Sequence, residues 1–358
     1  MTAPVVPARP VTREHMMTLM TGDQVAADPA AWHTYRRDGI TASEIAAVMG
    51  IPTAYGTPST VFWGKVDPEP GRDSIRFRVG HHMEPFIADE LARDDPALHL
   101  ADGGLWASVD RPWMMATFDR LGWRCDRCTS DGRRGGGHAT DWPPPGAAVM
   151  PVQMKTANAR QGEGWRWGEP PDGEIPGHYL AQVAWEMAVS GAAEAVLPCL
   201  IMPGGPLLVY RVVRDDELEA DIAAMIRAAE DMLRRVREYD PPPVDWRPET
   251  TAALRRVYRE ATEERVRIPV ELAERWRAAK RAVKLAEQRA GLAENEIRHR
   301  LGHALTAVTG TGEAEAVVAR RSLYTPRRLD LDRLRREAPE VAAEFTAPGG
   351  QVDKLLLK

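Results

Sequence analysis

Apolar residues in the first 240 positions follow two spacings, one typical of helices and one typical of strands. Segment 74–95 ends with apolar residues on one helical face, and 178–191 is a largely apolar run that closes at a glycine, so both predict helices. Further helices are expected at 39–50 and over roughly 215–239. This order of elements predicts an α/β core built on a mixed sheet. Its strands are expected at 104–110, 113–119, 148–156, 193–202 and 206–215.

Proline and glycine mark the interruptions between these elements. The proline triplet and the glycine run within 120–147 predict a loop between two strands. The Pro/Ala-rich segment 1–30 is expected to be loose, and 241–249 is expected to be a linker. The chain would then consist of a main domain over 31–240 and a helical extension with a small α/β tail over 250–358.

Beyond the linker, apolar and small residues recur in alternating steps of four and three. This is a heptad-like seam more than three heptads long. Its alanines predict close packing against another helix. The partner is expected to be 250–266 in a hairpin of the same chain, with self-association as the alternative. The seam consists of Leu272, Trp276, Ala279, Val283, Ala286, Ala290, Ala293 and Ile297.

Charge and composition narrow the class of protein. The 358 residues carry a net charge of −5, but 251–358 hold 22 basic and 16 acidic residues, a net +6, which leaves −5 − 6 = −11 on 1–250. An acidic main domain argues against DNA binding by charge alone. It allows a site in which acids hold metal ions and the metal meets a phosphate.

Three cysteines and no apolar run of about 18 residues predict a protein of a reducing, cytosolic compartment with no membrane segment. Lysine is scarce as well. Only six of the 47 basic residues are lysines, and Lys65 and Lys155 are the only two in the first 279 positions. A lysine kept in an arginine-rich chain hints at a need for a compact ammonium group.

Four positions on this map suggest metal-dependent phosphodiester cleavage. Asp119 ends one expected strand, and Gln153 and Lys155 lie two apart on the next, which puts them on one face. Glu84 comes from the helix upstream. Carboxylates can hold Mg²⁺, which activates water, and a lysine can orient that water. Taken singly, Glu84 could be a helix-dipole acid, Asp119 a turn residue and Lys155 an edge lysine.

Five segments in order resemble the phage lambda exonuclease/YqaJ-type viral recombinase family of the PD-(D/E)XK nuclease superfamily. They cover roughly 31–240. The resemblance implies a restriction-endonuclease-like core with a central mixed sheet flanked by helices. The matching segments are AWHTYRRDGITASE (31–44), VGHHMEPFIADE (79–90), MATFDRL (115–121), VQMKTA (152–157) and YLAQVAWEMAVSG (179–191).

By position, the resemblance implies a role for each matching residue. Glu84, Asp119 and the carbonyl of Met154 would bind Mg²⁺ or Mn²⁺, and Lys155 would be the catalytic lysine. The other matches concern DNA. Arg36 and Ser43 match positions that bind a 5′-terminal phosphate, which an arginine fork and a hydroxyl suit, and Gln182 would contact DNA or orient the water.

Two departures from the family pattern bear on catalysis. Gln153 stands where the family has Glu, so the site loses one carboxylate, although an amide oxygen can still bind Mg²⁺. Glu186 lies four residues after Gln182 and thus on the same helix face. We infer that Glu186 replaces the lost charge from the helix, as an auxiliary acid; this is not a feature of the family.

A second metal site is conceivable in the loop between the two catalytic strands. Cys125, Cys128 and His138 lie there, with Asp141 nearby as a fourth group for zinc. The alternative is two free thiols in a loop.

Together these residues predict a phage or prophage recombination exonuclease. It would degrade one strand of linear duplex DNA, 5′→3′, in the bacterial cytoplasm and pass the 3′ single strand to an annealing protein. Family members often form rings around DNA, so a trimer or similar homo-oligomer is expected. The alternatives are a pseudo-nuclease that binds DNA ends without cutting, because of Gln153, and a protein–protein adaptor built on 250–358.

Overall fold

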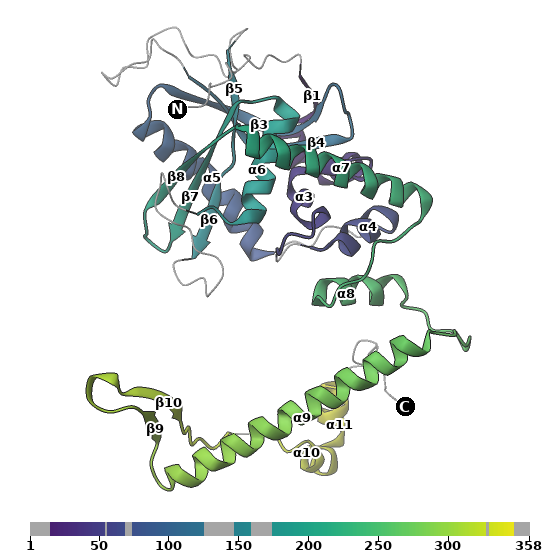
Figure 1. Cartoon of the computed structure of the whole chain (residues 1–358), viewed down its shortest axis with the longest axis vertical. Coiled ribbons are helices and arrows are strands. Elements are labelled where there is room, and N and C mark those ends of the chain that lie inside the picture. Colours follow the sequence, from purple (N-terminus) through teal and green to yellow (C-terminus); the bar gives the residue numbers. More distant parts are fainter. Residues whose placement is uncertain are drawn as a thin grey trace. The chain divides into compact units, whose positions relative to one another are not determined.

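The computed structural model describes residues 15–53, 56–68, 74–124, 147–158, 174–326 and 329–346. Contacts within the chain divide it into two units, and the division falls between Tyr258 and Arg259. Each unit is described by itself (Figure 1).

One mixed sheet lies at the centre of the first unit, with the strand order β1-β3-β4-β5-β7-β6. Strand β8 pairs antiparallel with β7, and the short β2 runs parallel to β4. Strands β5 and β6 run parallel to β7 while β4 pairs antiparallel with β3 and β5, so the predicted mixed sheet is confirmed. The strands are β1 Met16–Thr21, β2 Ile40–Thr41, β3 Leu98–Ser108, β4 Met114–Arg124, β5 Val149–Val152, β6 Lys155–Asn158, β7 Glu194–Met202 and β8 Leu207–Val213.

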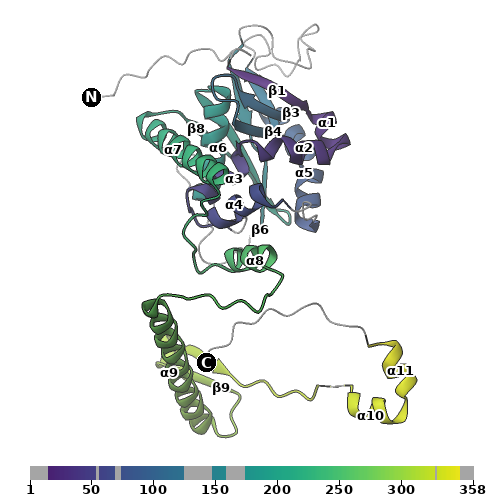
Figure 2. The same cartoon turned by 90° about the vertical axis from the view of Figure 1, so that its right-hand side faces the viewer.

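Helices cover both faces of this sheet (Figures 1 and 2). On one face, α3, α6 and α7 build the larger core, in which Trp185 and Met187 are fully buried. On the other face, α5 packs Ile87 and Leu91 against Val152. The helices of this unit are α1 Gly22–Ala27, α2 Pro29–Arg37, α3 Ala42–Val48, α4 Pro58–Val66, α5 Ile75–Asp94, α6 Gly177–Ser190, α7 Asp216–Glu238 and α8 Pro248–Val257.

The expectation that 1–30 is loose is wrong for the part that the structure describes. Strand β1 pairs with β3, and a shift in register between Thr18 and Met20 lets it bury Met16 and Met20 in two different clusters of the core. Thr21 and Asp28 then accept hydrogen bonds from backbone N–H groups as N-caps of α1 and α2. The two buried methionines and the two helix caps therefore order this part of the segment despite its Pro/Ala-rich composition.

The expected strand 148–156 is interrupted. β5 ends at Val152 and β6 begins at Lys155, so Gln153 and Lys155 do not share one continuous strand. β5 pairs with both β4 and β7, whereas β6 pairs with β7 alone among the strands that the structure describes. The Asp119 carboxylate accepts the backbone N–H of Met154 at 2.7 Å, and this side-chain bond stands where the β4–β5 ladder ends.

The boundary between the units lies further along the chain than the expected linker. Segment 241–247 contains no helix or strand, but α8 follows it within the first unit and packs against α4. The hydroxyls of Thr57 and Thr250 lie 2.8 Å apart and are buried. α8 therefore belongs to the first unit and not to the extension, in which it was expected.

The second unit contains one long helix, a two-stranded sheet and two short helices. No residue of the 32-residue α9 is buried by the described part of the chain. None of the described helices combines the length and the apolar character needed to cross a bilayer. The elements are α9 Val270–Leu301, β9 Thr306–Thr309, η1 Gly312–Ala314, β10 Ala316–Arg320, α10 Leu331–Glu337 and α11 Pro339–Glu344.

Candidate active site

Asp119 lies on β4 at the point where the sheet splits between β5 and β6. Its Oδ2 accepts the Met154 N–H, which fixes the carboxyl group against the chain that links these two strands. Loss of solvent raises the pKa of Asp119, and the nearby Lys155 ammonium opposes this rise. The predicted pair, Asp119 and Lys155, is therefore brought together, although the two residues lie on different strands of the sheet.

Glu84 approaches Asp119 from α5. Burial and the neighbouring Asp119 carboxylate raise the pKa of Glu84 to about 7. His81, one turn earlier, shares a hydrogen bond of 2.9 Å between its Nδ1 and Glu84 Oε1. Two carboxyl groups that disfavour each other's ionisation are a common precursor of a cation site, because a cation removes their repulsion.

Glu186 is a third carboxyl group at this place. Its side chain is fully buried on α6, and burial followed by the Asp119 charge raises its pKa to about 8. Gln182 Nε2 donates to Glu186 Oε1 at 3.0 Å, so the two helix residues point the same way, as their spacing predicts. Gln182 is thereby held to Glu186.

Two buried oxygens near these groups have no hydrogen-bond partner among the described residues: Oε1 of Gln153 and Oε2 of Glu186. Gln153 is 4% exposed and follows β5 directly. A buried oxygen without a donor is costly unless something else satisfies it. A cation could satisfy both oxygens. Even so, within the described ranges no three acidic, His or Cys side chains are gathered closely enough to form a ready-made metal site.

Lys155 begins β6 and is half-buried. Its Nζ lies 5.1 Å from the ring centroid of Tyr179, a cation–π contact that positions the ammonium group. The Lys155 charge opposes the rise in the pKa of both Asp119 and Glu186. Burial, and then the same charge, lower the pKa of His178 to about 4. One ammonium group therefore faces two carboxyl groups and a neutral imidazole.

Arg36 and Ser43 form a second cluster at the N-terminal end of α3. Arg36 Nη2 donates to Ser43 Oγ at 2.8 Å and to Thr41 Oγ1 at 3.1 Å. The guanidinium carbon lies 4.2 Å from the ring centroid of Trp32, whose Nε1 donates to Thr117 Oγ1. Ser43 is exposed, so this pair of donors faces solvent as an anion site would.

Behind this cluster lie two charged residues that the sequence interpretation did not assign a role. Glu44 Oε2 accepts from the backbone N–H and the hydroxyl of Thr41, at 2.9 and 2.8 Å. Lys65 is buried and donates to both Glu44 oxygens and to the carbonyl of Arg36. Two signals could have found them: Thr41 and Glu44 have the spacing of a capping box, and Lys65 is a rare lysine.

The predicted zinc ligands Cys125, Cys128 and His138 lie outside the described residues, as does Asp141.

Comparison with known proteins finds a family model that matches part of the chain. Residues 31–193 match the model of the YqaJ-like viral recombinase domain. No curated protein matches the chain. The family match confirms the resemblance drawn from the sequence, and with it a deoxyribonuclease of the phage recombination type. The mixed sheet with helices on both faces agrees with the predicted PD-(D/E)XK-type core.

Solved structures of exonucleases are similar to the chain at a low level. LHK-Exo in complex with dAMP is 16% identical, with 58% of this chain and 94% of that chain covered and a TM-score of 0.39. The alkaline exonuclease LHK-Exo from Laribacter hongkongensis is 15% identical, with 58% and 96% covered and a TM-score of 0.37. A phage related exonuclease from Haemophilus somnus 129PT is 11% identical, with 56% and 96% covered and a TM-score of 0.35.

Proposed function

Residues 31–193 are a YqaJ-like viral recombinase domain, and on this premise we propose that the protein is a metal-dependent exonuclease. It degrades one strand of linear double-stranded DNA from its ends, 5′→3′, and leaves a 3′ single strand. The observation that carries this proposal is the convergence of Glu84, Glu186 and Lys155 on Asp119. The Asp119 charge raises the pKa of both glutamates, and the Lys155 charge opposes the rise in the pKa of Asp119.

The metal would be Mg²⁺ or Mn²⁺, held by Glu84, Asp119 and the backbone carbonyl of Met154. The two orphaned oxygens of Gln153 and Glu186 support this assignment, because both are buried and lack donors among the described residues. Oxygen ligands of this kind suit hard divalent cations. Glu186 would supply the charge that Gln153 lacks.

The remaining chemistry belongs to the chain's own residues. A bound divalent cation would neutralise the scissile phosphate and lower the pKa of the attacking water. Lys155 orients that water with an ammonium group that Tyr179 holds in place. The Met154 N–H bonds one oxygen of Asp119, and the other oxygen would remain to bind the metal. Gln182 positions Glu186 through the amide bond between them.

Arg36 and Ser43 would bind the terminal 5′-phosphate of the DNA end. Arg36 is stacked on Trp32 and bonded to Ser43, so its donors are ordered before DNA arrives. A preorganised guanidinium loses less entropy on binding a phosphate than a free one. By binding this phosphate, the cluster would place the 5′ strand in the active site and so set the polarity of digestion.

The biological setting follows from the family. The chain would be encoded by a phage or prophage and act in the bacterial cytoplasm. It would deliver the 3′ strand to a single-strand annealing protein, and its first unit would form a ring-like homo-oligomer such as a trimer around DNA.

The decisive experiment is digestion of linear duplex DNA that is 5′-phosphorylated and labelled on one strand. Mg²⁺- or Mn²⁺-dependent loss of the 5′ strand, absent in Lys155→Ala, is the expected result. The second candidate is a DNA-end-binding pseudo-nuclease, which Gln153 favours. It would bind ends yet leave them intact with either metal, and that outcome would overturn the exonuclease.

A further inference from the structure

The long helix α9 carries an apolar seam that the described part of its own unit leaves uncovered. Leu272 is 40% and Val283 is 54% exposed, and no residue of the helix is buried. The predicted hairpin partner, 250–266, contributes no helix to this unit, because α8 packs on α4 instead. Most of the stability of a helix in a protein comes from packing its apolar face against a neighbour, which favours a partner for this seam.

We propose that this partner is α9 of a second copy of the chain, in an antiparallel two-stranded coiled coil. In heptad terms, Trp276, Val283, Ala290 and Ile297 take the a positions, and Leu272, Ala279, Ala286 and Ala293 take the d positions. An antiparallel pair places each a residue opposite a d residue of the second copy. The helices can be aligned so that these layers coincide from end to end.

Side-chain size favours this alignment. It places Trp276 opposite Ala293 of the second copy, and Val283 opposite Ala286 of the second copy. Leu272 then faces Ile297 of the second copy. A large residue therefore meets a small one in the first two of these layers, and Ala279 faces Ala290 of the second copy in the layer between them. A parallel pair would instead set Trp276 against itself and each alanine against an alanine, which alternates crowding with gaps.

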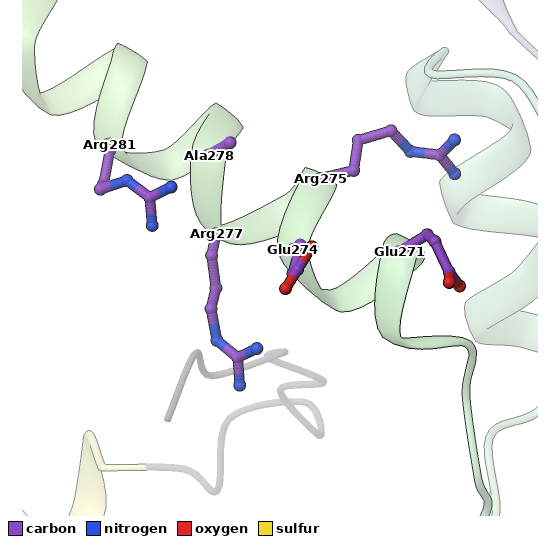
Figure 3. A pocket seen from close by; sticks show the side chains of 6 residues that line it. All are labelled: Glu271, Glu274, Arg275, Arg277, Ala278 and Arg281. Atoms are coloured by element: carbon purple, nitrogen blue, oxygen red, sulfur yellow. The ribbon is translucent and has the colours of Figure 1, made fainter.

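Charge at the edges of the seam favours the same alignment. Lys280 comes opposite Glu287 of the second copy, and Arg275 comes opposite Glu296 of the second copy, so the flanking contacts of charged residues are pairs of opposite sign. A parallel pair would bring Arg275 against Lys280 of the second copy. Figure 3 shows the side chains of Arg275 and Arg277 leaving α9 on different sides.

The length of α9 fits this register too. The two-fold axis of the alignment passes between Lys284 and Leu285, and the helix runs from Val270 to Leu301. The two helices therefore overlap over almost their whole length. The six side chains drawn in Figure 3, among them Glu271 and Arg281, line a shallow pocket, and all of them belong to α9.

Disulfide trapping of the full-length chain tests the pairing and its direction. The background carries Cys125→Ser, Cys128→Ser and Cys199→Ala, and two proteins of different size tag carry Ala279→Cys or Ala290→Cys. In the antiparallel pair, these positions face each other, whereas each lies about 16 Å along the axis from its own copy, at 1.5 Å per residue. Crosslinks are expected only when the two proteins are mixed.

Two other results would overturn the proposal: crosslinks in each protein alone, which indicate a parallel pair, or no crosslink in any sample. Circular dichroism of both variants checks that α9 remains helical. Both cysteines lie on α9, so the crosslink reports the pairing of this helix and does not depend on whether the first unit forms a ring.

A charge swap provides an independent test by sedimentation equilibrium. Lys280→Glu and Glu287→Lys each place like charges opposite one another twice, and each is expected to raise the Kd of the α9-mediated association about tenfold. The double variant Lys280→Glu/Glu287→Lys restores opposite signs and is expected to recover the original Kd. Failure of the double variant to recover would count against the antiparallel register.

Discussion

Lys65 donates hydrogen bonds to both carboxylate oxygens of Glu44, at 3.1 and 3.2 Å, and its side chain is only 3% exposed. Lys65 comes from α4 and Glu44 from α3, so the pair joins two helices. Glu44 in turn holds Thr41, which accepts a hydrogen bond from Arg36. This ion pair is therefore the support on which the proposed 5′-phosphate cluster is built.

Removing one member of the pair is expected to destabilise the protein strongly. Lys65→Met leaves Glu44, whose side chain is 22% exposed, with Arg36 as its remaining nearby cation. Breaking a fully buried ion pair costs about 3–5 kcal/mol, so a loss toward the lower end of this range is expected. Denaturant unfolding followed by circular dichroism measures the loss. The matched control is Lys65→Met/Glu44→Gln, which removes both charges and is expected to regain most of the stability. A double variant as unstable as the single one would show that the ion pair is not the cause.

Arg36 is expected to act on the DNA end and not on the hydrolytic step. Arg36→Ala removes the guanidinium that bonds Ser43, so degradation of 5′-phosphorylated duplex should fall by about 10- to 100-fold, the equivalent of one charge-assisted hydrogen bond. Degradation of duplex with 5′-hydroxyl ends should change little. Initial rates on the two substrates give the comparison. An equal loss on both would place Arg36 in folding or in catalysis instead.

Most of the fold was predictable, because apolar spacing within a segment reports helix or strand directly. Strands β7 and β8 and helices α6 and α7 lie where this spacing predicts. The errors arose where a tertiary contact decides the outcome. Asp119 of β4 captures the Met154 N–H and divides a segment that looks like one strand, and Thr57 holds Thr250 across nearly two hundred positions.

The candidate site was predictable to the extent that motif order places residues on neighbouring elements. Glu84, Asp119 and Lys155 were expected together, and in the structure the Lys155 charge acts on the pKa of Asp119 while the Asp119 charge acts on that of Glu84. The Glu44–Lys65 pair was not expected, because the two residues are 21 positions apart on separate helices. No local pattern reports which buried lysine meets which acid.

Substitutions at Gln153 and Glu186 should change the metal affinity in opposite directions. Glu186→Gln keeps the shape of the side chain but removes a charge, so Mn²⁺ affinity measured by calorimetry should fall at least about tenfold, in the range seen when groups around a metal are lost. Glu186→Ala should abolish cleavage. Unchanged cleavage in Glu186→Ala would sink the idea of a rescuing acid.

Gln153→Glu restores the carboxylate of the family pattern and should tighten Mn²⁺ binding. If it also raises the cleavage rate sharply, the natural protein is an impaired nuclease. Thermal unfolding without metal shows whether either change acts through stability.

The metal-free protein should lose stability as the pH rises. The folded state holds protons on Glu84 and Glu186 up to pKa values of about 7 and about 8, above the usual pKa of 4.5 for a glutamate in the unfolded chain. Between pH 4.5 and about 8, the folded state therefore binds more protons than the unfolded state, and stability falls with increasing pH. With EDTA present, the Tm of the protein should therefore decline from pH 6 to pH 9. Glu186→Gln cannot ionise, so its decline should be shallower than that of the natural chain. Added Mg²⁺ should raise the Tm more at pH 8 than at pH 6, because binding requires the ionised carboxylates. Parallel Tm profiles for the two proteins would mean that Glu186 does not titrate in this range.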